Sequence, residues 1–348
     1  MGGSVEEEIL HPVLQLSLLR SMLVLGITLG DERGIGPEVV FKALATSRIH
    51  DGKAIVLIGD PTTIDDQARQ QGIAEPIRPW PGRAQAEGGL WKVGTSKESG
   101  AARAAIESLE KGSGLGLSGE IDGLVTGPVN KASILREGIS FTGQTEWLTE
   151  RAGNPMTGMM LLGTDQNGRW LRVLLATTHV PLRSVPGVIT RGGILRSIQL
   201  ASKACRELGL VTTRIAVCGL NPHAGEEGML GTEEVELISP AIQEARNSGM
   251  EVTGPCSGDT VFREAIHGSH DVVVAMYHDQ GLAPLKLVAF ETGVNWTVGL
   301  PYPRTSPDHG TAFDIAGRNV ADPTSMKKAM ELAWQLIERR RLSSGVSP

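Results

Sequence analysis

Short apolar runs that stop abruptly at polar turns recur along the chain, and segments with helical periodicity alternate with them. Continuous β-branched runs without polar alternation are typical of strands that helices cover on both faces. The alternation therefore predicts an α/β fold with mostly parallel sheets. The predicted strands are Leu23–Thr28, Ala54–Asp60, Ile121–Thr126, Trp170–Ala176, Arg214–Leu220 and Val272–Tyr277.

Helix signals separate these runs. Pro37 followed by Glu38 predicts a helix start, because proline and an acidic residue both favour the first turn. Further helices are predicted over Ser99–Lys111 and Met326–Arg341. Residues 72–99 are rich in Pro and Gly without a clean period, which predicts a connection or a small antiparallel excursion.

Composition narrows the class of protein. The 348 residues are 40% hydrophobic and 21% charged, with a net charge of -6, which argues against a nucleic-acid-binding surface. No apolar run reaches the roughly 18 residues of a membrane span. The 3 cysteines are scattered and odd in number, which favours a reducing compartment. We therefore expect a cytoplasmic protein that binds neither nucleic acid nor a membrane.

Three predicted strands run into a histidine and then a turn: His179, His223 and His278. One such histidine is usually structural. Three in the same topological position can converge, because ligands of open α/β sheets bind beyond the carboxyl ends of the strands. Three imidazoles with an open fourth position are typical of a catalytic divalent-metal centre. The sequence thus predicts a metal site.

Downstream of the last of these strands lie Lys286, Asn295, Arg304 and His309, on or beside short strands and loops. Lysine and arginine supply positive charge and asparagine supplies directed hydrogen bonds, which suits a small anion such as phosphate or carboxylate. The alternative is that each is an ordinary polar residue of a turn.

Two other polar residues have two interpretations each. Thr145 either caps the helix that follows it or binds a phosphate at the helix N-terminus. Asp259 either caps the helix that carries Phe262 and Ala265, or acts as an acid or base beside a metal.

Two glycine-rich stretches resemble nucleotide loops. Gly114–Gly119 matches GxGxxG, but a predicted helix precedes it and a strand follows, the reverse of the dinucleotide-binding order. We expect it to be a helix-to-strand linker, so the chain lacks a Rossmann fingerprint. The loop Gly30–Glu38 enters a helix and is either an anion site or a tight strand-to-helix connection.

A set of motifs then stands out in order: ITLGDERGIGPEVV, TGPVNKASI, FTGQTEWLTE, TTHVPLRSV, GLNPHAGEEGMLGTEE, GDTVF, AMYHDQGLAPLK and RTSPDHGTAFDIAG. Together they resemble the 4-hydroxythreonine-4-phosphate dehydrogenase family, from about Leu23 to about Ile337. The resemblance implies an isopropylmalate dehydrogenase-like fold of two α/β domains around a cleft. We assign 23–140 with 296–342 to the first domain and 141–295 to the second. Residues 1–22 are expected to be a loose extension and 343–348 a disordered tail.

The resemblance also implies roles. The family's metal ligands fall on His179, His223 and His278, and its active site lies at a homodimer interface with ligands from both subunits. The metal would be one divalent ion, such as zinc, magnesium or cobalt. Lys286 or Asp259 would move the proton in catalysis. The substrate-binding residues would be Gln144, Thr145, Lys286, Asn295 and Arg304.

The implied activity is NAD- or NADP-linked oxidation of a phosphorylated four-carbon 3-hydroxy acid, followed by decarboxylation of the 3-keto acid. The substrate would be 4-phosphohydroxythreonine of the pyridoxine pathway, or phospho-threonate or phospho-erythronate. Alternatives are a dehydrogenase of a cis-diol carboxylate and a three-histidine hydrolase or lyase. Two departures matter: the family's GHTE is here Gly143-Gln144-Thr145-Glu146, and GDPAGIGPE is here GDERGIGPE.

Overall fold

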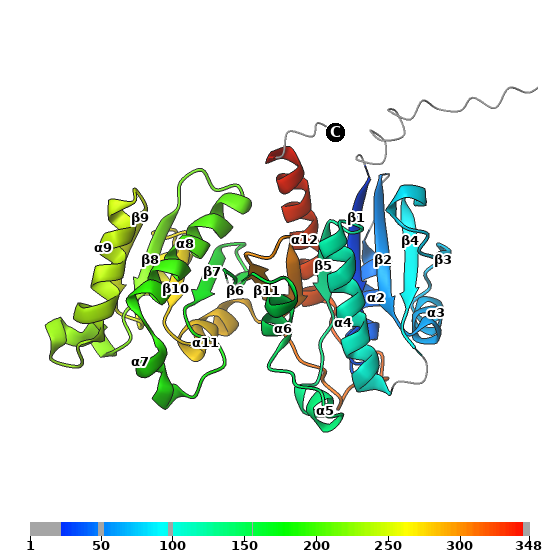
Figure 1. The fold of residues 1–348 in the computed structure, drawn as a ribbon, viewed down its shortest axis with the longest axis horizontal. Helices are drawn as coiled ribbons and strands as arrows, with labels where there is room; N and C mark the ends of the chain where they lie inside the picture. Colours follow the sequence, from blue (N-terminus) through cyan, green and yellow to red (C-terminus); the bar gives the residue numbers. More distant parts are fainter. Residues whose placement is uncertain (1–21, 48–51, 97–99, 155, 344–348) are drawn as a thin grey trace, which may run out of the picture.

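The computed structural model describes residues 22–47, 52–96, 100–154 and 156–343 (Figure 1). Their strands form one sheet of 12, in the order β3-β4-β2-β1-β5-β12-β11-β6-β7-β10-β8-β9. The strands are β1 Leu23–Thr28, β2 Lys53–Gly59, β3 Ile77–Pro79, β4 Gly89–Gly94, β5 Gly123–Thr126, β6 Gly158–Thr164, β7 Trp170–Leu175, β8 Arg214–Cys218, β9 Glu251–Cys256, β10 Val272–Ala275, β11 Val294–Val298 and β12 Arg304–Pro307.

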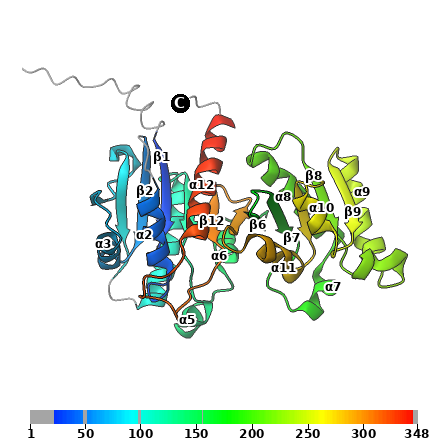
Figure 2. The same cartoon turned by 180° about the vertical axis from the view of Figure 1, so that it is seen from behind.

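Helices cover both faces of this sheet (Figures 1 and 2). The α-helices are α2 Gly36–Thr46, α3 Pro61–Gln70, α4 Ala101–Ser118, α5 Lys131–Arg136, α6 Gln144–Arg151, α7 Val185–Val188, α8 Arg191–Glu207, α9 Ser239–Asn247, α10 Val261–Ile266, α11 His278–Ala289 and α12 Thr324–Ser343. Shorter helical turns are η1 Arg83–Gln85, η2 Leu182–Ser184, η3 Pro222–Gly228 and η4 Glu234–Ile238.

Two parallel blocks meet at antiparallel strands in the middle of the sheet. Strands β3, β4, β2, β1, β5 and β12 are all parallel, as are β7, β10, β8 and β9. Between the blocks, β11 is antiparallel to both β12 and β6, and β6 is antiparallel to β7. The predicted α/β fold with mostly parallel strands is therefore confirmed. The sheet crosses the predicted domain boundary without a break, and the division into two domains stays a prediction.

The largest hydrophobic core packs α2, α12, α8 and α9 against one face of the sheet along both blocks. On the other face, α4 and α6 cover the first block and α10 and α11 cover the second. Strands β1, β2, β5, β8 and β10 are buried almost throughout, as the absence of polar alternation predicted. The packed sheet and helices hold in place the loops at the ends of the strands.

Several expected boundaries were wrong. Residues 72–99 contain β3 and β4, which run parallel to their neighbours rather than as an antiparallel excursion. Met22, assigned to the loose extension, is buried in the core and its carbonyl accepts a hydrogen bond from Arg83. Ser343, assigned to the tail, is the last residue of α12. Residues 1–21 and 344–348 of those two predicted segments lie outside the described residues.

Gly114–Gly119 is not a linker, because the helix continues through it: α4 ends at Ser118 and Gly119 is its left-handed C-cap. The absence of a side chain at Gly116 lets the helix pack closely against Tyr302. A Cβ atom at this position would lie 2.7 Å from two ring carbons of Tyr302. The order helix then strand, opposite to a dinucleotide loop, is as predicted.

Gly116→Ala is expected to lower the stability of the fold and to leave cofactor binding alone. Overpacking of a rigid aromatic neighbour costs roughly 1–3 kcal/mol. Thermal melting together with a titration of NAD(P)H measures the two effects separately. A native melting curve with a tenfold weaker dinucleotide would show that this stretch contacts the cofactor after all.

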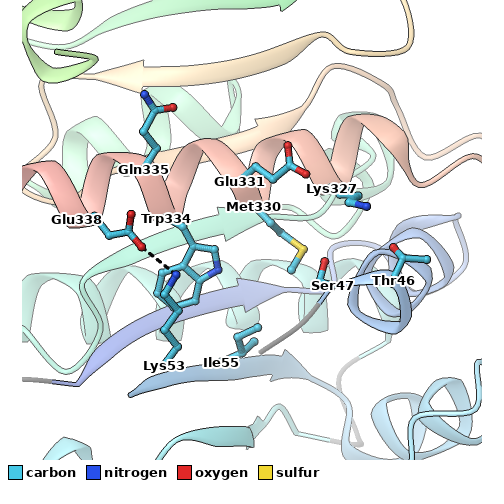
Figure 3. Close-up of a pocket in the computed structure, with 10 residues that line it drawn as sticks. All are labelled: Thr46, Ser47, Lys53, Ile55, Lys327, Met330, Glu331, Trp334, Gln335 and Glu338. Carbon is cyan, nitrogen blue, oxygen red and sulfur yellow. Dashed lines mark ion pairs between the residues drawn. The ribbon is translucent and has the colours of Figure 1, made fainter. Parts of the chain in front are cut away.

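A cavity of about 400 Å³ lies between α12, the end of α2 and the start of β2 (Figure 3). Met330 and Ile55 form its apolar floor. At its rim, Lys53 lies over the Trp334 ring, 4.9 Å from the centroid, and pairs with Glu338 at 2.8 Å. The cation thus already occupies the ring face, which makes this cavity a packing feature of α12. No helix among the described residues is long and apolar enough to cross a membrane.

Candidate active site

A second cavity, of about 420 Å³, lies where the two parallel blocks meet. It is lined by residues that follow β5 and β7, begin α6 and α11, and belong to β11, β12 and the loop after β12. Eight of the predicted site residues line it together: Gln144, Thr145, His179, His278, Lys286, Asn295, Arg304 and His309. His223 and Asp259 are not among its lining residues.

Arg304 is the largest polar group in this cavity and is only 1% exposed. Its Nε and Nη2 donate to Thr126 Oγ1, at 3.2 and 2.5 Å, and Nη1 donates to Thr297 Oγ1 at 3.0 Å. Nη1 also donates to Thr145 Oγ1 at 3.4 Å, and Nη2 to Gln144 Oε1 at 3.0 Å. A guanidinium has five N–H groups, so neutral side-chain oxygens satisfy all of them.

The charge of Arg304 has no close counter-charge. No carboxylate in the described part of the chain forms an ion pair with it within 4.0 Å, although the charge of Glu146 acts on it from further away. Burial lowers the pKa of Arg304 to about 10, so the group remains protonated at neutral pH. A buried cation without a partner is costly, and an anionic ligand relieves that cost. The anion-binding prediction therefore has a physical basis here.

Thr145 does not cap its helix. Gly143 occupies the N-cap position of α6 without a side-chain hydrogen bond, and the Thr145 hydroxyl instead lies 3.3 Å from Thr297 Oγ1 and faces Arg304. The cap interpretation is thereby excluded, and binding of an anion beside Arg304 stays a prediction.

His179 and His278 lie side by side, with ring centroids 5.6 Å apart. Their strands, β7 and β10, are neighbours in the sheet. His179 Nδ1 lies 3.1 Å from Glu146 Oε1, and His278 Nδ1 lies 2.7 Å from Asp279 Oδ1. Since a carboxylate only accepts, each Nδ1 carries the proton, and each Nε2 keeps its lone pair when the ring is neutral. Metal-binding histidines usually have such carboxylate partners, so this pair fits a divalent ion.

The contact between Glu146 and His179 also changes the pKa of both side chains. Their hydrogen bond lowers the pKa of the Glu146 carboxyl and raises the pKa of the His179 imidazole. The second oxygen of Glu146, Oε2, is buried and has no hydrogen-bond partner. The sequence showed this residue within QTE but gave no indication of its link to His179, because the link crosses between α6 and the loop after β7.

His223 follows β8, the other neighbour of β10, and stands on an unusual turn. Residues His223–Glu227 have positive φ, from 41° to 80°, and only one of them is glycine. Left-handed backbone costs roughly 1–2 kcal/mol per non-glycine residue, so neighbouring structure must enforce it. Glu234, 2% exposed, accepts the N–H groups of Leu220 and Asn221 at 2.7 Å each. Such enforced strain is typical of functional sites.

Within the chain, the three histidines do not form one cluster. In the described ranges, no three His, Cys, Asp or Glu side chains are placed to hold a metal ion. The three-histidine centre thus stays a prediction, with His179 and His278 together and His223 separate.

Asp259 lies near enough to His223 to feel its charge, and it does not line the cavity. It accepts a hydrogen bond from Ser257 at 2.7 Å, which lowers the pKa of its carboxyl, and the charge of His223 lowers it further. Thr260 occupies the N-cap position of α10 and makes no side-chain cap, so the cap interpretation of Asp259 is excluded. Of the two predicted proton-transfer residues, only Lys286 lines the cavity.

Lys286 faces a half-buried acid, Asp308, that sequence reasoning missed. Its Nζ lies 3.5 Å from Asp308 Oδ2 and 3.4 Å from the Asp308 carbonyl oxygen. Burial raises the pKa of the Asp308 carboxyl, and burial lowers the pKa of the adjacent His309. Asn295 Oδ1 and His309 Nε2 are buried without partners. These atoms would hold polar groups of a substrate or of a dinucleotide in the cavity.

The loop Gly30–Glu38 is a tight connection. A Cβ atom on Gly36 would lie 2.2 Å from the Leu29 carbonyl oxygen, and one on Gly34 would lie 2.6 Å from that of Thr311. The Ile35 N–H donates to the same Thr311 oxygen at 2.9 Å. These glycines therefore serve backbone packing, which favours the connection over the anion site.

Glu146→Gln is expected to weaken metal binding by roughly 10- to 100-fold, because loss of the carboxylate partner lowers the basicity and the order of a histidine ligand. Calorimetric titration of the protein with Zn²⁺ measures this. The matched control is Glu150→Gln on the same helix, whose carboxylate does not line the cavity. Equal affinities for all three proteins would contradict a ligand role for His179.

The family model described as "Pyridoxal phosphate biosynthetic protein PdxA" matches residues 51–333. This chain belongs to that family. A 4-hydroxythreonine-4-phosphate dehydrogenase from Beijerinckia indica is 41% identical over 325 residues, which cover 90% of this chain and 94% of the relative. The resemblance inferred from the motifs and the expectation of an oxidoreductase are thereby confirmed.

Similar solved structures include members of the same family. The 4-hydroxythreonine-4-phosphate dehydrogenase of Klebsiella pneumoniae superposes with a TM-score of 0.77 at 35% identity, covering 90% of this chain and 99% of that one. A terephthalate 1,2-cis-dihydrodiol dehydrogenase from Burkholderia xenovorans gives 0.64 at 27%, covering 90% and 98%. An isocitrate dehydrogenase from Methylococcus capsulatus gives 0.51 at 15%, covering 93% and 89%, which shows the shared fold alone.

Proposed function

We propose that this PdxA-family protein oxidises a phosphorylated four-carbon 3-hydroxy acid with NAD or NADP and a divalent metal ion, and that the 3-keto acid product then loses carbon dioxide. The substrate is 4-phosphohydroxythreonine, as in the names of the relatives, or phospho-threonate or phospho-erythronate. One observation carries this proposal: a single cavity combines the uncompensated Arg304 cation with the His179–His278 pair.

The cation accounts for the anionic end of the substrate. Arg304 attracts the phosphate or carboxylate, and Lys286 adds a second positive group at the cavity wall. Asn295 Oδ1, buried and unpartnered, accepts a hydrogen bond from the substrate or the cofactor. Thr145, which also lines the cavity and accepts a hydrogen bond from Arg304, adds a hydroxyl.

The histidine pair accounts for the hydroxyl that is oxidised. A bound divalent ion lowers the pKa of a ligated hydroxyl and polarises the carbonyl formed from it, and a nicotinamide accepts the hydride. His179 and His278 would hold the ion through Nε2, since their Nδ1 atoms are bound to carboxylates. Lys286, which lines the same cavity, would move the proton between the hydroxyl and the carbon that loses carbon dioxide.

A second copy of the chain would supply His223 as the third ligand. Large apolar side chains in the segments that follow the proposed metal ligands are exposed, and exposed apolar surface is typical of interaction sites. They are Val180, Leu182 and Val188 after His179, Leu287 and Phe290 on and after α11, and Met229, Leu230 and Val235 after His223. A symmetric homodimer through these residues would bury them and bring His223, with Asp259, to the partner's cavity.

The test is a substrate screen with the purified protein. We expect metal-dependent NADH or NADPH formation at 340 nm with one phosphorylated hydroxy acid, accompanied by release of carbon dioxide. Candidate acids are 4-phosphohydroxythreonine, phospho-threonate, phospho-erythronate and a non-phosphorylated cis-diol carboxylate. Absence of reduced cofactor with all phosphorylated acids would contradict the proposal. Undiminished activity after chelation would contradict its metal part. The cytoplasmic location stays a prediction.

A further inference from the structure

We propose that Gln144 acts on the substrate through Arg304: it is the fourth wall of a neutral cage that holds the guanidinium as a fixed cation. The other walls are Thr126, Thr145 and Thr297. This inference rests on the proposed role of Arg304 in anion binding. It names a positioning residue at the point where this chain leaves its family's GHTE pattern.

Both ends of the Gln144 amide are already bound within the protein. Its Oε1 accepts from Arg304 Nη2 at 3.0 Å, and its Nε2 donates to the Gly127 carbonyl oxygen at 3.1 Å. The amide thus bridges the loop after β5 and the guanidinium on β12. These two bonds fix the plane of the amide and leave one N–H of Nε2 and one lone pair of Oε1 unused.

Glutamine suits this bridge for a chemical reason. An amide presents one acceptor and a donor group at every pH. A histidine at the same position presents an acceptor only while it is neutral, and when protonated it would place a second cation beside Arg304. The change from the family's histidine therefore keeps an acceptor permanently on the guanidinium.

The cage also limits how many hydrogen bonds Arg304 can donate to a bound anion. All five N–H groups of the guanidinium are used, and the longest bond, to Thr145 at 3.4 Å, is the one most easily exchanged for a ligand oxygen. Binding then depends on the fixed charge and at most one exchanged bond. A bidentate fork on the anion would require the cage to open.

The experiment is a double-mutant cycle on phosphate binding, because residues that act through one another give non-additive effects. Inorganic phosphate is titrated by calorimetry into the full-length wild type, Gln144→Ala, Arg304→Met and the double variant. No turnover is needed, so failure here is distinct from failure of the proposed reaction. Gln335→Ala, on α12 and away from the cavity, is the control.

We expect Gln144→Ala to weaken phosphate about tenfold and Arg304→Met about a hundredfold. The double variant should bind phosphate no more weakly than Arg304→Met alone. A further tenfold loss in the double variant would show direct contact and overturn the inference. So would an unchanged affinity of Gln144→Ala, or a wild type that does not bind phosphate.

A second variant covers the case in which Arg304→Met does not fold. Gln144→Glu places a carboxylate on the guanidinium, and hydrogen bonds between charged groups outweigh the lost amide bond to Gly127. The melting temperature without ligand should rise while phosphate binding falls at least about a hundredfold. A lower melting temperature would contradict a stabilising hydrogen bond between residue 144 and Arg304.

Discussion

Mixing two inactive variants, His223→Ala and His278→Ala, is expected to restore about a quarter of the wild-type activity. Each variant alone lacks one of the three proposed metal ligands. In a mixed dimer, one site receives both substitutions and the other receives neither, provided that His223 reaches the partner's cavity. Random exchange makes half of the dimers mixed, which leaves about one intact site in four.

The structure motivates this expectation directly. His179 and His278 lie together in one cavity, whereas His223 stands on the strained turn after β8 and does not line it. The measurement is activity after unfolding and refolding the two variants together. The control is a mixture of His278→Ala with His179→Ala, whose substitutions fall in the same cavity, and which should stay inactive. Recovery in neither mixture would place all three ligands within one chain or exclude His223.

Arg304→Met is expected to lower kcat/KM by roughly 100- to 1,000-fold, about 3–4 kcal/mol, with most of the loss in KM. Methionine fills much of the same volume but removes the buried charge that attracts the phosphate. Steady-state kinetics on the best substrate of the screen measures the effect. Its hydrogen bonds in the described structure go to Thr126, Thr145, Thr297 and Gln144 and not to the histidine pair, so Zn²⁺ affinity should change much less than kcat/KM.

Two comparisons separate charge from packing. Arg304→Lys keeps the charge but can make only three of the five hydrogen bonds, so we expect an intermediate loss. Tyr302 is the neighbouring buried residue, and its hydroxyl lies 3.2 Å from Ser113 Oγ. Tyr302→Phe perturbs the packing beside Arg304 and leaves the guanidinium charge in place. If it lowers kcat/KM as strongly as Arg304→Met, local packing and not the cation controls binding.

The sequence by itself determined the fold class and several of the polar residues that line the cavity. Buried parallel strands are apolar without alternation, so six strands could be located from hydrophobicity alone. Their mostly parallel arrangement was also predicted, whereas the structure alone shows that β10 lies between β7 and β8. The polar residues beyond their ends were found for the same reason. What hydrophobicity does not encode is the exact end of a helix, and α4 accordingly ran on through the apparent glycine motif.

Only the tertiary structure decided what each polar residue does. Thr145 and Asp259 had the sequence signature of helix caps, yet one faces Arg304 and the other binds Ser257. The links between Glu146 and His179 and between Lys286 and Asp308 join residues 22 or more positions apart. Such links have no local signature, because a side chain's partner is set by how strands and helices pack. Local pattern specifies the elements, and packing specifies the site.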